Sequence, residues 1–301
     1  MPHNPAVFRS GFVALVGRPN AGKSTLLNTL VGSKIAIVTD KPQTTRNRIL
    51  GIVHQPNAQL VLMDTPGIHK PFSELNRQMM THVHGALREM DLLLLMVDAT
   101  EPFGQGDQFV LELLKPYRGK RFLLLNKIDL VRKPKLLPLI SRYTKAYEFD
   151  EVFPISALQR EGLSPLLRAA SAVLPEGPQY FPPDMCTDQP ERFLAAEIVR
   201  EKLIQATRKE LPYVTAILVE SFEETERLTR IHATILVERA SQKAIVIGGK
   251  GERIKSVGTA ARLELEKRFG QKVYLELFVK VAPRWRDDTR LIDSLDYQKF
   301  T

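Results

Sequence analysis

Two runs of nearly uninterrupted apolar residues constrain the fold of this 301-residue chain more than any other feature. Leu92–Val97 reads LLLLMV and Phe122–Asn126 reads FLLLN. Strands of a parallel sheet are covered by helices on both faces, so they read as continuous apolar runs. Similar short runs alternate with amphipathic helical stretches from Phe12 to Leu174, which is typical of a mostly parallel sheet with covering helices. The sequence therefore predicts an α/β domain.

The strands expected in this domain are an edge strand and five buried strands. In chain order they are Phe12–Val16, the edge strand Ile49–His54, Gln59–Asp64, Asp91–Asp98, Phe122–Asn126 and Glu151–Ile155. Five prolines then fall between residues 175 and 190. Proline lacks a backbone donor and resists helix and sheet interiors, so this segment is either a linker or a pinned extended crossing.

The order of elements changes beyond the prolines. Helices are expected at Arg192–Thr207, Ala240–Ile247 and Glu252–Phe269, and strands at Thr215–Phe222, Leu228–Glu238 and Lys272–Val281. The polar turn EETER between the first two strands indicates an antiparallel pair, so this half reads as a small α+β unit. In the last residues, Trp285 either packs on the sheet or belongs to a mobile tail.

Composition narrows the class of protein without identifying it. Hydrophobic residues make up 44% and charged residues 26% of the chain, which excludes a wholly disordered protein. The single cysteine, Cys186, excludes an intrachain disulfide and suits a reducing cytoplasm, and no Cys and His cluster has metal-ligand spacing. The longest apolar run is far shorter than the ~20 residues of a membrane span, and the first residues lead directly into a core strand. We therefore expect a soluble protein without a removable signal, whose net charge of +9 fits a polyanionic partner.

A phosphate-binding loop is expected directly after the first strand. Residues 17–24 read GRPNAGKS, which fits G-x-x-x-x-G-K-[ST] and precedes a helix expected at Ser24–Leu30. The glycines let successive N–H groups face phosphates, and the helix N-terminus adds a favourable dipole. We expect Lys23 to hold the β- and γ-phosphates and Ser24 to ligate Mg²⁺. The candidate nucleotide-binding residues here are Gly17, Arg18, Pro19, Asn20, Ala21, Gly22, Lys23, Ser24 and Thr25.

A second motif, DTPG, follows the next buried strand. It delivers an acidic residue to the sheet edge where open α/β sheets bind their ligands. We expect Asp64 to bind Mg²⁺ through water and the Gly67 N–H to meet the γ-phosphate. The motif adds Asp64, Thr65, Pro66 and Gly67 to the candidate nucleotide-binding residues.

The polar stretch Lys41–Arg46 lies between these two motifs and lacks strong helical periodicity. A threonine here can complete the Mg²⁺ shell only while the γ-phosphate is present, which ties loop order to nucleotide state. Thr44 and Thr45 both qualify, and Thr45 is the preferred candidate.

The motif NKID, at the end of a further strand, predicts guanine as the base. The Asp129 carboxylate can accept hydrogen bonds from guanine N1–H and the 2-amino group, whereas adenine has an acceptor at N1 and no 2-amino group. SAL, after the last strand, can supply a backbone N–H to guanine O6. These motifs add Asn126, Lys127, Asp129, Ser156, Ala157 and Leu158 to the candidate nucleotide-binding residues.

One departure from Ras-like enzymes bears on the mechanism. They place a water-orienting glutamine directly after D-x-x-G, and this position is Ile68, which cannot orient water. Hydrolysis must then depend on Lys23, Mg²⁺ and backbone donors, and a further cation can contribute. We predict a GTP hydrolase with slow intrinsic turnover, with Lys23, Thr45 and Gly67 as the candidate catalytic residues.

In the second half, the segment VIGGKGERIK places G-x-x-G just before an amphipathic helix. Such a loop lets its backbone approach a sugar-phosphate chain, and the helix forms one wall of a groove for about four unpaired nucleotides. G-x-x-G alone is a weak signal, and the surrounding order of strands and helices strengthens the RNA-binding interpretation. The candidate RNA-binding residues are Gly248, Gly249, Lys250, Gly251, Arg253 and Lys255.

Together, GRPNAGKS, PQTTR, DTPG, NKID, SAL and VIGGKGERIK resemble the Era family of bacterial GTPases over essentially the whole chain. The resemblance implies a Ras-like P-loop GTPase domain with a mostly parallel sheet at 1–174, a linker at 175–190, an α+β type II KH domain at 191–284 and a tail at 285–301. It implies binding of GTP and GDP, contact near the 3′ end of small-subunit ribosomal RNA, and participation in assembly and maturation of that subunit. Asparagine at the position of Asn20 often accompanies a potassium ion in this branch, so Asn20 is the candidate K⁺ ligand. The residue after D-x-x-G is commonly apolar in this branch too.

The leading hypothesis is a monomeric, cytoplasmic GTPase switch that binds ribosomal RNA and associates peripherally with the inner membrane. One alternative is a membrane-surface or cell-cycle signalling GTPase whose KH-like domain binds protein or lipid. A passive RNA-binding module with a vestigial nucleotide site is the weakest reading, because Lys23, Ser24, Asp64 and Asp129 are all present.

Overall fold

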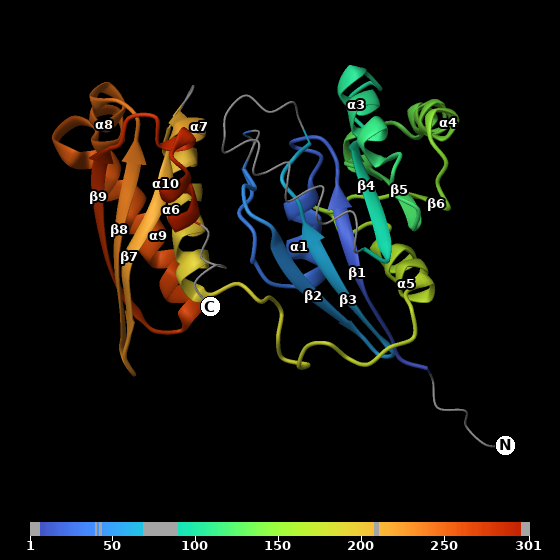
Figure 1. Cartoon of the computed structure of the whole chain (residues 1–301), viewed down its shortest axis with the longest axis horizontal. Coiled ribbons are helices and arrows are strands. Elements are labelled where there is room, and N and C mark those ends of the chain that lie inside the picture. Colours follow the sequence, from blue (N-terminus) through green and yellow to red (C-terminus); the bar gives the residue numbers. More distant parts are fainter. Residues whose placement is uncertain (1–6, 40, 42–43, 69–89, 208–210, 296–301) are drawn as a thin grey trace. The chain divides into compact units, whose positions relative to one another are not determined.

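The computed structural model describes residues 7–39, 41, 44–68, 90–207 and 211–295. The chain divides into two compact units (Figure 1). Of the described residues, the first unit holds those up to Asp188 apart from 37–41, and the second holds 37–41 and those from Gln189 onward. Each unit is described by itself below.

The first unit is built on a six-stranded sheet in the order β2-β3-β1-β4-β5-β6. The strands are β1 (Arg9–Val16), β2 (Ile49–Gln55), β3 (Ala58–Asp64), β4 (Leu92–Asp98), β5 (Lys120–Asn126) and β6 (Glu151–Pro154). Only the β2–β3 pair among them is antiparallel, and β2 is an edge strand, as the sequence predicts. The carboxyl ends of β1, β3, β4 and β5 therefore share one edge of the sheet, where the predicted motifs begin.

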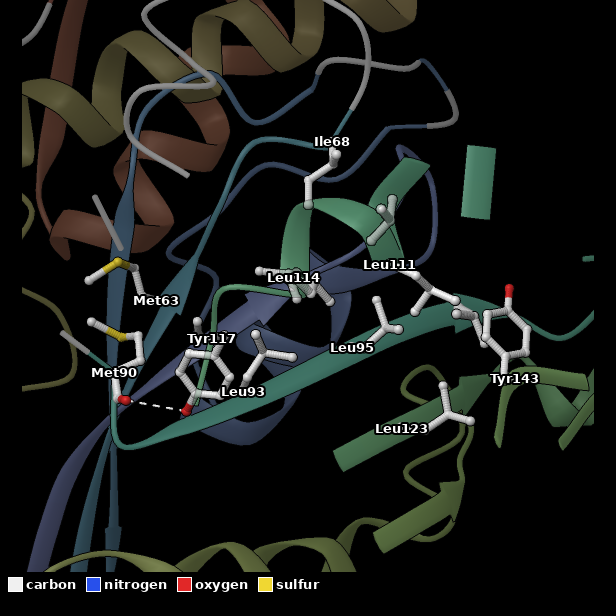
Figure 2. Close-up of a cluster of buried hydrophobic side chains, with 14 of the residues drawn as sticks. Met63, Ile68, Met90, Leu93, Leu95, Leu111, Leu114, Tyr117, Leu123 and Tyr143 are labelled. Carbon is white, nitrogen blue, oxygen red and sulfur yellow. Dashed lines mark hydrogen bonds between the residues drawn. The ribbon is translucent and has the colours of Figure 1, made fainter. Parts of the chain in front are cut away.

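The described helices of this unit are α1 (Lys23–Val31), α3 (Gln105–Leu114), α4 (Leu136–Ala146) and α5 (Leu163–Val173), with short 3-10 turns at Ile128–Leu130 and Lys133–Lys135. Helix α3 turns Val110, Leu111 and Leu114 inward to a cluster of buried side chains that also includes Leu93 and Leu95 of β4 (Figure 2). Tyr117, just after α3, donates from its hydroxyl to Met90 O at 3.2 Å, so the buried phenol has a partner. This packing fixes α3 beside the carboxyl ends of the strands.

The proline-rich segment is a pinned crossing along the first unit. Ser10 N donates to Pro175 O at 3.1 Å, and Ile52 N, on the edge strand β2, donates to Cys186 O at 2.9 Å. Gln59 of β3 accepts hydrogen bonds from the N–H groups of Tyr180 and Phe181 at 2.8 and 3.0 Å. The segment up to Asp188 belongs to the first unit for this reason.

The second unit holds a three-stranded sheet in the order β7-β8-β9. Its elements are α6 (Glu191–Ala206), α7 (Leu211–Val214), β7 (Ala216–Glu224), β8 (Leu228–Val237), α8 (Ala240–Ile247), a 3-10 turn at Gly249–Gly251, α9 (Glu252–Phe269), β9 (Lys272–Val281), a 3-10 turn at Trp285–Asp287 and α10 (Thr289–Ser294). β7 and β8 are antiparallel, which confirms the predicted pair, and β8 and β9 are parallel. Helices α6 and α9 pack against each other and against the sheet.

The described part of the tail packs on this sheet. Trp285 is fully buried with Ala216 and Leu236, and its indole Nε1 donates to Val214 O at 2.9 Å. Leu291 packs against the same cluster from α10. Of the two alternatives for Trp285, the structure shows the packed one. None of the helices within the described ranges is long and apolar enough to cross a membrane.

Candidate functional site

The phosphate loop is held by the ends of two strands. Gly17 has φ +154°, and a Cβ there would lie 2.2 Å from Met96 O on β4. Gly22 has φ +100°, and a Cβ there would lie 2.2 Å from Asn126 Nδ2 on β5. Between them Asn20 adopts φ +63°, in the left-handed region. The two glycines are therefore required by close contacts inside the protein.

Lys23 is buried and turned back into this loop. Its Nζ donates to Gly17 O at 3.2 Å and to Arg18 O at 3.1 Å. An ammonium group has three donors, so two are aimed by the loop carbonyls and one is left to meet an anion. Burial lowers the pKa of Lys23, although the nearby Asp64 carboxylate acts in the opposite direction. A bound phosphate would favour the charged form of Lys23 and so oppose the effect of burial on its pKa.

Three oxygen-bearing side chains meet next to the loop. Ser24 Oγ donates to Asp64 Oδ2 at 2.6 Å, and Thr45 Oγ1 donates to the same oxygen at 3.1 Å. The two hydroxyl oxygens are 2.9 Å apart. Burial raises the pKa of Asp64, and its Oδ1 is buried with no hydrogen-bond partner among the described residues. Hard oxygen ligands around an incompletely satisfied carboxylate fit Mg²⁺. Thr45 supplies a hydroxyl to this cluster, and Thr44 is half-buried beside it.

The DTPG motif lies against the phosphate loop. Thr65 Oγ1 donates to Leu15 O at 2.7 Å, and Ile68 N donates to Gly17 O at 3.0 Å. A Cβ on Gly67 would lie 2.8 Å from Pro19 Cα, so only glycine allows this approach. The Ile68 side chain is 3% exposed and belongs to the core cluster shown in Figure 2. It therefore points into the core of the protein.

Asn126 joins the loop to the SAL motif. Its Nδ2 donates to Ala21 O at 2.9 Å, and its Oδ1 accepts from Ala157 N at 2.9 Å. Lys127 adopts φ +66° and donates from Nζ to Asp98 Oδ2. The structure thus brings these motifs together at one edge of the sheet, with Ser156 buried, and with Asp129 and Leu158 exposed.

Two carboxylates here were not among the residues expected from the sequence. Asp98 ends β4 and pairs with Lys127; burial alone would raise its pKa, but hydrogen bonds from Lys127 and Thr100 outweigh burial and lower it. Asp107, on α3, accepts from Arg18 Nη1 at 3.1 Å. Asp98 could have been found from its place at the carboxyl end of a strand, but Asp107 carries no comparable signal.

A cavity of about 590 Å³ opens beside the phosphate loop. Arg18, Asn20, Asp98, Asp107 and Lys127 are among its lining residues. It therefore gives a ligand access to the outer side of the loop, where Asn20 lies.

The G-x-x-G loop of the second unit joins α8 to α9. Gly248, Lys250 and Gly251 have φ values of +74°, +50° and +79°. A Cβ on Gly249 or Gly251 would meet nothing within 4 Å, so the backbone of this loop is open to close approach. Lys250 and Lys255 are exposed.

Arg253, a predicted phosphate contact, is placed differently from these two lysines. Its Nη1 donates to Ile245 O near the end of α8. The guanidinium therefore links the start of α9 to the end of α8 across the loop.

Comparison with known proteins supports both units. A family model described as 50S ribosome-binding GTPase matches residues 12–127, and a KH domain model matches residues 210–286. The chain is 50% identical to GTPase Era of Syntrophus aciditrophicus over 295 residues, covering 97% of this chain and 96% of that protein. It is also 50% identical to GTPase Era of Geobacter metallireducens over 299 residues, covering 99% and 100%.

Solved structures agree with these relatives. Era in complex with MgGDPNP and nucleotides 1506–1542 of 16S ribosomal RNA matches with a TM-score of 0.93 and 41% identity, covering 96% of this chain and 99% of that one. A variant of Aquifex aeolicus Era bound to GDP.AlF4⁻ matches with a TM-score of 0.92 and 41% identity, with the same coverage. The predicted fold class, a Ras-like GTPase domain with a mostly parallel sheet followed by a KH domain, is confirmed.

Proposed function

The chain belongs to the Era family of GTPases, and we propose that it is a switch that binds the 3′-end region of small-subunit ribosomal RNA through its KH domain. Its enzyme class is GTP hydrolase, as the sequence predicts. We propose further that binding of this RNA assists assembly and maturation of the small subunit. The observation that carries the proposal is the pairing of the Ser24, Thr45 and Asp64 cluster with an open G-x-x-G loop in one chain.

Magnesium is assigned to the oxygen cluster. Ser24 and Thr45 would hold the ion directly and Asp64 through water, because the buried Oδ1 of Asp64 lacks a partner among the described residues. The ion supplies neutralisation of charge on the β- and γ-phosphates. Lys23 contributes its third donor to the same phosphates, and the Gly67 N–H faces the γ-phosphate. Asn20, which lines the cavity beside the loop, is the proposed K⁺ ligand.

Selection of guanine is assigned to Asp129 and the SAL motif. A bound base would cover the exposed Asp129 carboxylate and give it two donors. Because Ala157 N already donates to Asn126 Oδ1, guanine O6 must share that donor or use the N–H of Leu158.

Slow intrinsic hydrolysis follows from the position of Ile68. With its side chain in the core, Ile68 cannot orient the attacking water. Catalysis then rests on Lys23, backbone donors and bound cations. In the switch itself, Thr45 would complete the magnesium shell only while the γ-phosphate is present, which would connect γ-phosphate binding to the order of its loop.

RNA recognition is assigned to the G-x-x-G loop. The space around Gly249 and Gly251 suits a close approach of the sugar-phosphate chain, and the exposed Lys250 and Lys255 suit phosphate contacts. Gly248 shapes the loop, and Arg253 links the two helices that flank it.

The test is binding of short single-stranded RNAs from the 3′ end of small-subunit ribosomal RNA, with GTP analogue, GDP or no nucleotide. Gly249→Asp/Lys250→Asp is expected to abolish binding while leaving nucleotide affinity unchanged. A matched control is Ser141→Asp/Lys145→Asp, because both side chains are exposed on α4 and the charge change is the same. An equal loss of RNA binding in both variants would show that net charge alone explains the effect.

A membrane-surface or cell-cycle signalling GTPase is the alternative. This alternative predicts no RNA binding in any nucleotide state. If no RNA binding is measured, the signalling function replaces the RNA-binding one as our proposal. The monomeric state, the cytoplasmic location and the peripheral association with the inner membrane remain predictions of the family resemblance. Sedimentation with and without vesicles of inner-membrane lipids tests the first and the last.

A further inference from the structure

Helix α3 is tied to the phosphate loop by one side-chain contact. Arg18 Nη1 donates to Asp107 Oδ2 at 3.1 Å across 89 residues of sequence. The Arg18 side chain is 41% exposed, whereas the Asp107 side chain is 5% exposed. The cation can therefore be solvated without its partner, but the carboxylate cannot.

Asp107 is held rigidly from its own side. Its Oδ2 also accepts from Gly104 N at 2.9 Å, at the start of α3. Helix α3 is fixed in turn by Val110, Leu111 and Leu114 in the core cluster. A buried carboxylate that accepts hydrogen bonds from Arg18 and Gly104, on a packed helix, has a fixed position.

Through Arg18, the Asp107 carboxylate positions a carbonyl group. The Arg18 carbonyl oxygen accepts from Lys23 Nζ at 3.1 Å, so it fixes one of the three donor directions of the ammonium group. A shift of the Arg18 backbone would redirect the donor that faces the phosphates.

We propose that Asp107 is a positioning residue for GTP hydrolysis, acting through Arg18 to aim Lys23. The inference rests on the phosphate-binding role proposed for Lys23. In this arrangement, Arg18 contributes its carbonyl to the loop and its guanidinium to the anchor on α3. Asp107 stands outside the sequence motifs, because it belongs to none of the six.

The experiment is a double-mutant cycle on kcat at saturating GTP, with Arg18→Ala, Asp107→Asn and the double variant. Each single variant is expected to lower kcat about tenfold, since a misplacement of ~1 Å in a catalytic group costs up to about a hundredfold. The double variant is expected to equal the single variants, because the two changes break one connection. Thermal unfolding of each variant is measured in parallel.

A purely structural role for Asp107 gives a different pattern. If Asp107 only caps α3, Asp107→Asn keeps its full effect in the Arg18→Ala background and the two factors multiply to about a hundredfold. That result, or a wild-type kcat for Asp107→Asn, overturns the proposal. If Asp107→Asn fails to fold, Arg18→Lys replaces it: a kcat well above that of Arg18→Ala supports the anchor, and equal values overturn it.

Two further variants complete the design. Asp150→Asn is the matched control, because Asp150 pairs with Lys120 and accepts from Arg121 N at the opposite end of the sheet. Its kcat is expected to stay at the wild-type value. Lys23→Ala tests the premise separately: a variant that still binds and hydrolyses GTP normally would remove the role of Lys23, whatever the cycle shows.

Discussion

Asn126 Nδ2 donates a 2.9 Å hydrogen bond to the carbonyl oxygen of Ala21, which joins β5 to the phosphate loop across 105 residues of sequence. The same side chain accepts from Ala157 N. One buried amide thus fixes the phosphate loop relative to the SAL motif, which we propose to meet the base.

Removing this amide has a defined expected cost. Asn126→Ala leaves Ala21 O and Ala157 N without their buried partner, and we expect the free energy of unfolding of the first unit to fall by about 2–4 kcal/mol. Affinity for GDP, measured by fluorescence titration, should fall at least about tenfold. The exposed Asn57→Ala is the control and should leave both quantities unchanged. An Asn126→Ala protein with wild-type affinity would show that the loop needs no such connection.

The two threonines before β2 offer a matched pair. Thr45→Ala removes a hydroxyl from the cluster with Ser24 and Asp64, so affinity for a GTP analogue in Mg²⁺ should fall about tenfold, equivalent to ~1.4 kcal/mol. Affinity for GDP should change little, because the loop is expected to be ordered only with the γ-phosphate, which GDP lacks. Thr44→Ala should behave as wild type, and calorimetric titration distinguishes the two. If the losses are reversed between the variants, Thr44 is the ligand.

Restoring the Ras-like glutamine should not restore fast hydrolysis. Ile68→Gln places an amide in a position that is 3% exposed within the core cluster, and we expect it to destabilise the first unit by about 2–3 kcal/mol. Its kcat should not rise, since the backbone aims this side chain inward. Ile68→Leu, which keeps the volume, should cost less than about 1.5 kcal/mol. A glutamine variant with tenfold faster single-turnover hydrolysis would refute this reading.

The tail should contribute strongly to the stability of the second unit. Trp285→Ala removes a fully buried side chain and its bond to Val214 O, at an expected cost of about 3–5 kcal/mol. Tyr274→Ala, on the same sheet but 48% exposed, should cost about 1 kcal/mol or less. Thermal unfolding followed by circular dichroism checks both. Equal losses would mean that burial of the tail adds little.

The sequence predicts those parts of the site that short motifs encode. Lys23, Ser24 and Asp64 follow strands whose apolar runs are unmistakable, so both the strands and their carboxyl ends can be located from the sequence. The β7–β8 pair can also be predicted from the sequence, because a short polar turn separates two apolar stretches.

What the sequence cannot provide are contacts between distant residues. Asp107 lies in an ordinary amphipathic helix, and its pairing with Arg18 depends on how α3 packs. The contact of Arg253 with Ile245 O also depends on the end of α8, because a guanidinium can reach a phosphate or a carbonyl oxygen equally well. The prolines indicate extended backbone, but they do not say where it binds.

The attachment of that proline-rich crossing protects the sheet from unwanted partners. β2 lies at the border of the sheet, and Ile52 N would be open to pairing with a foreign strand if Cys186 O did not accept from it. An uncovered border strand is a template for intermolecular sheet growth. A protein truncated after Leu174 would keep every nucleotide-binding motif and lose the segment that covers β2. It should therefore self-associate at concentrations where the full chain does not.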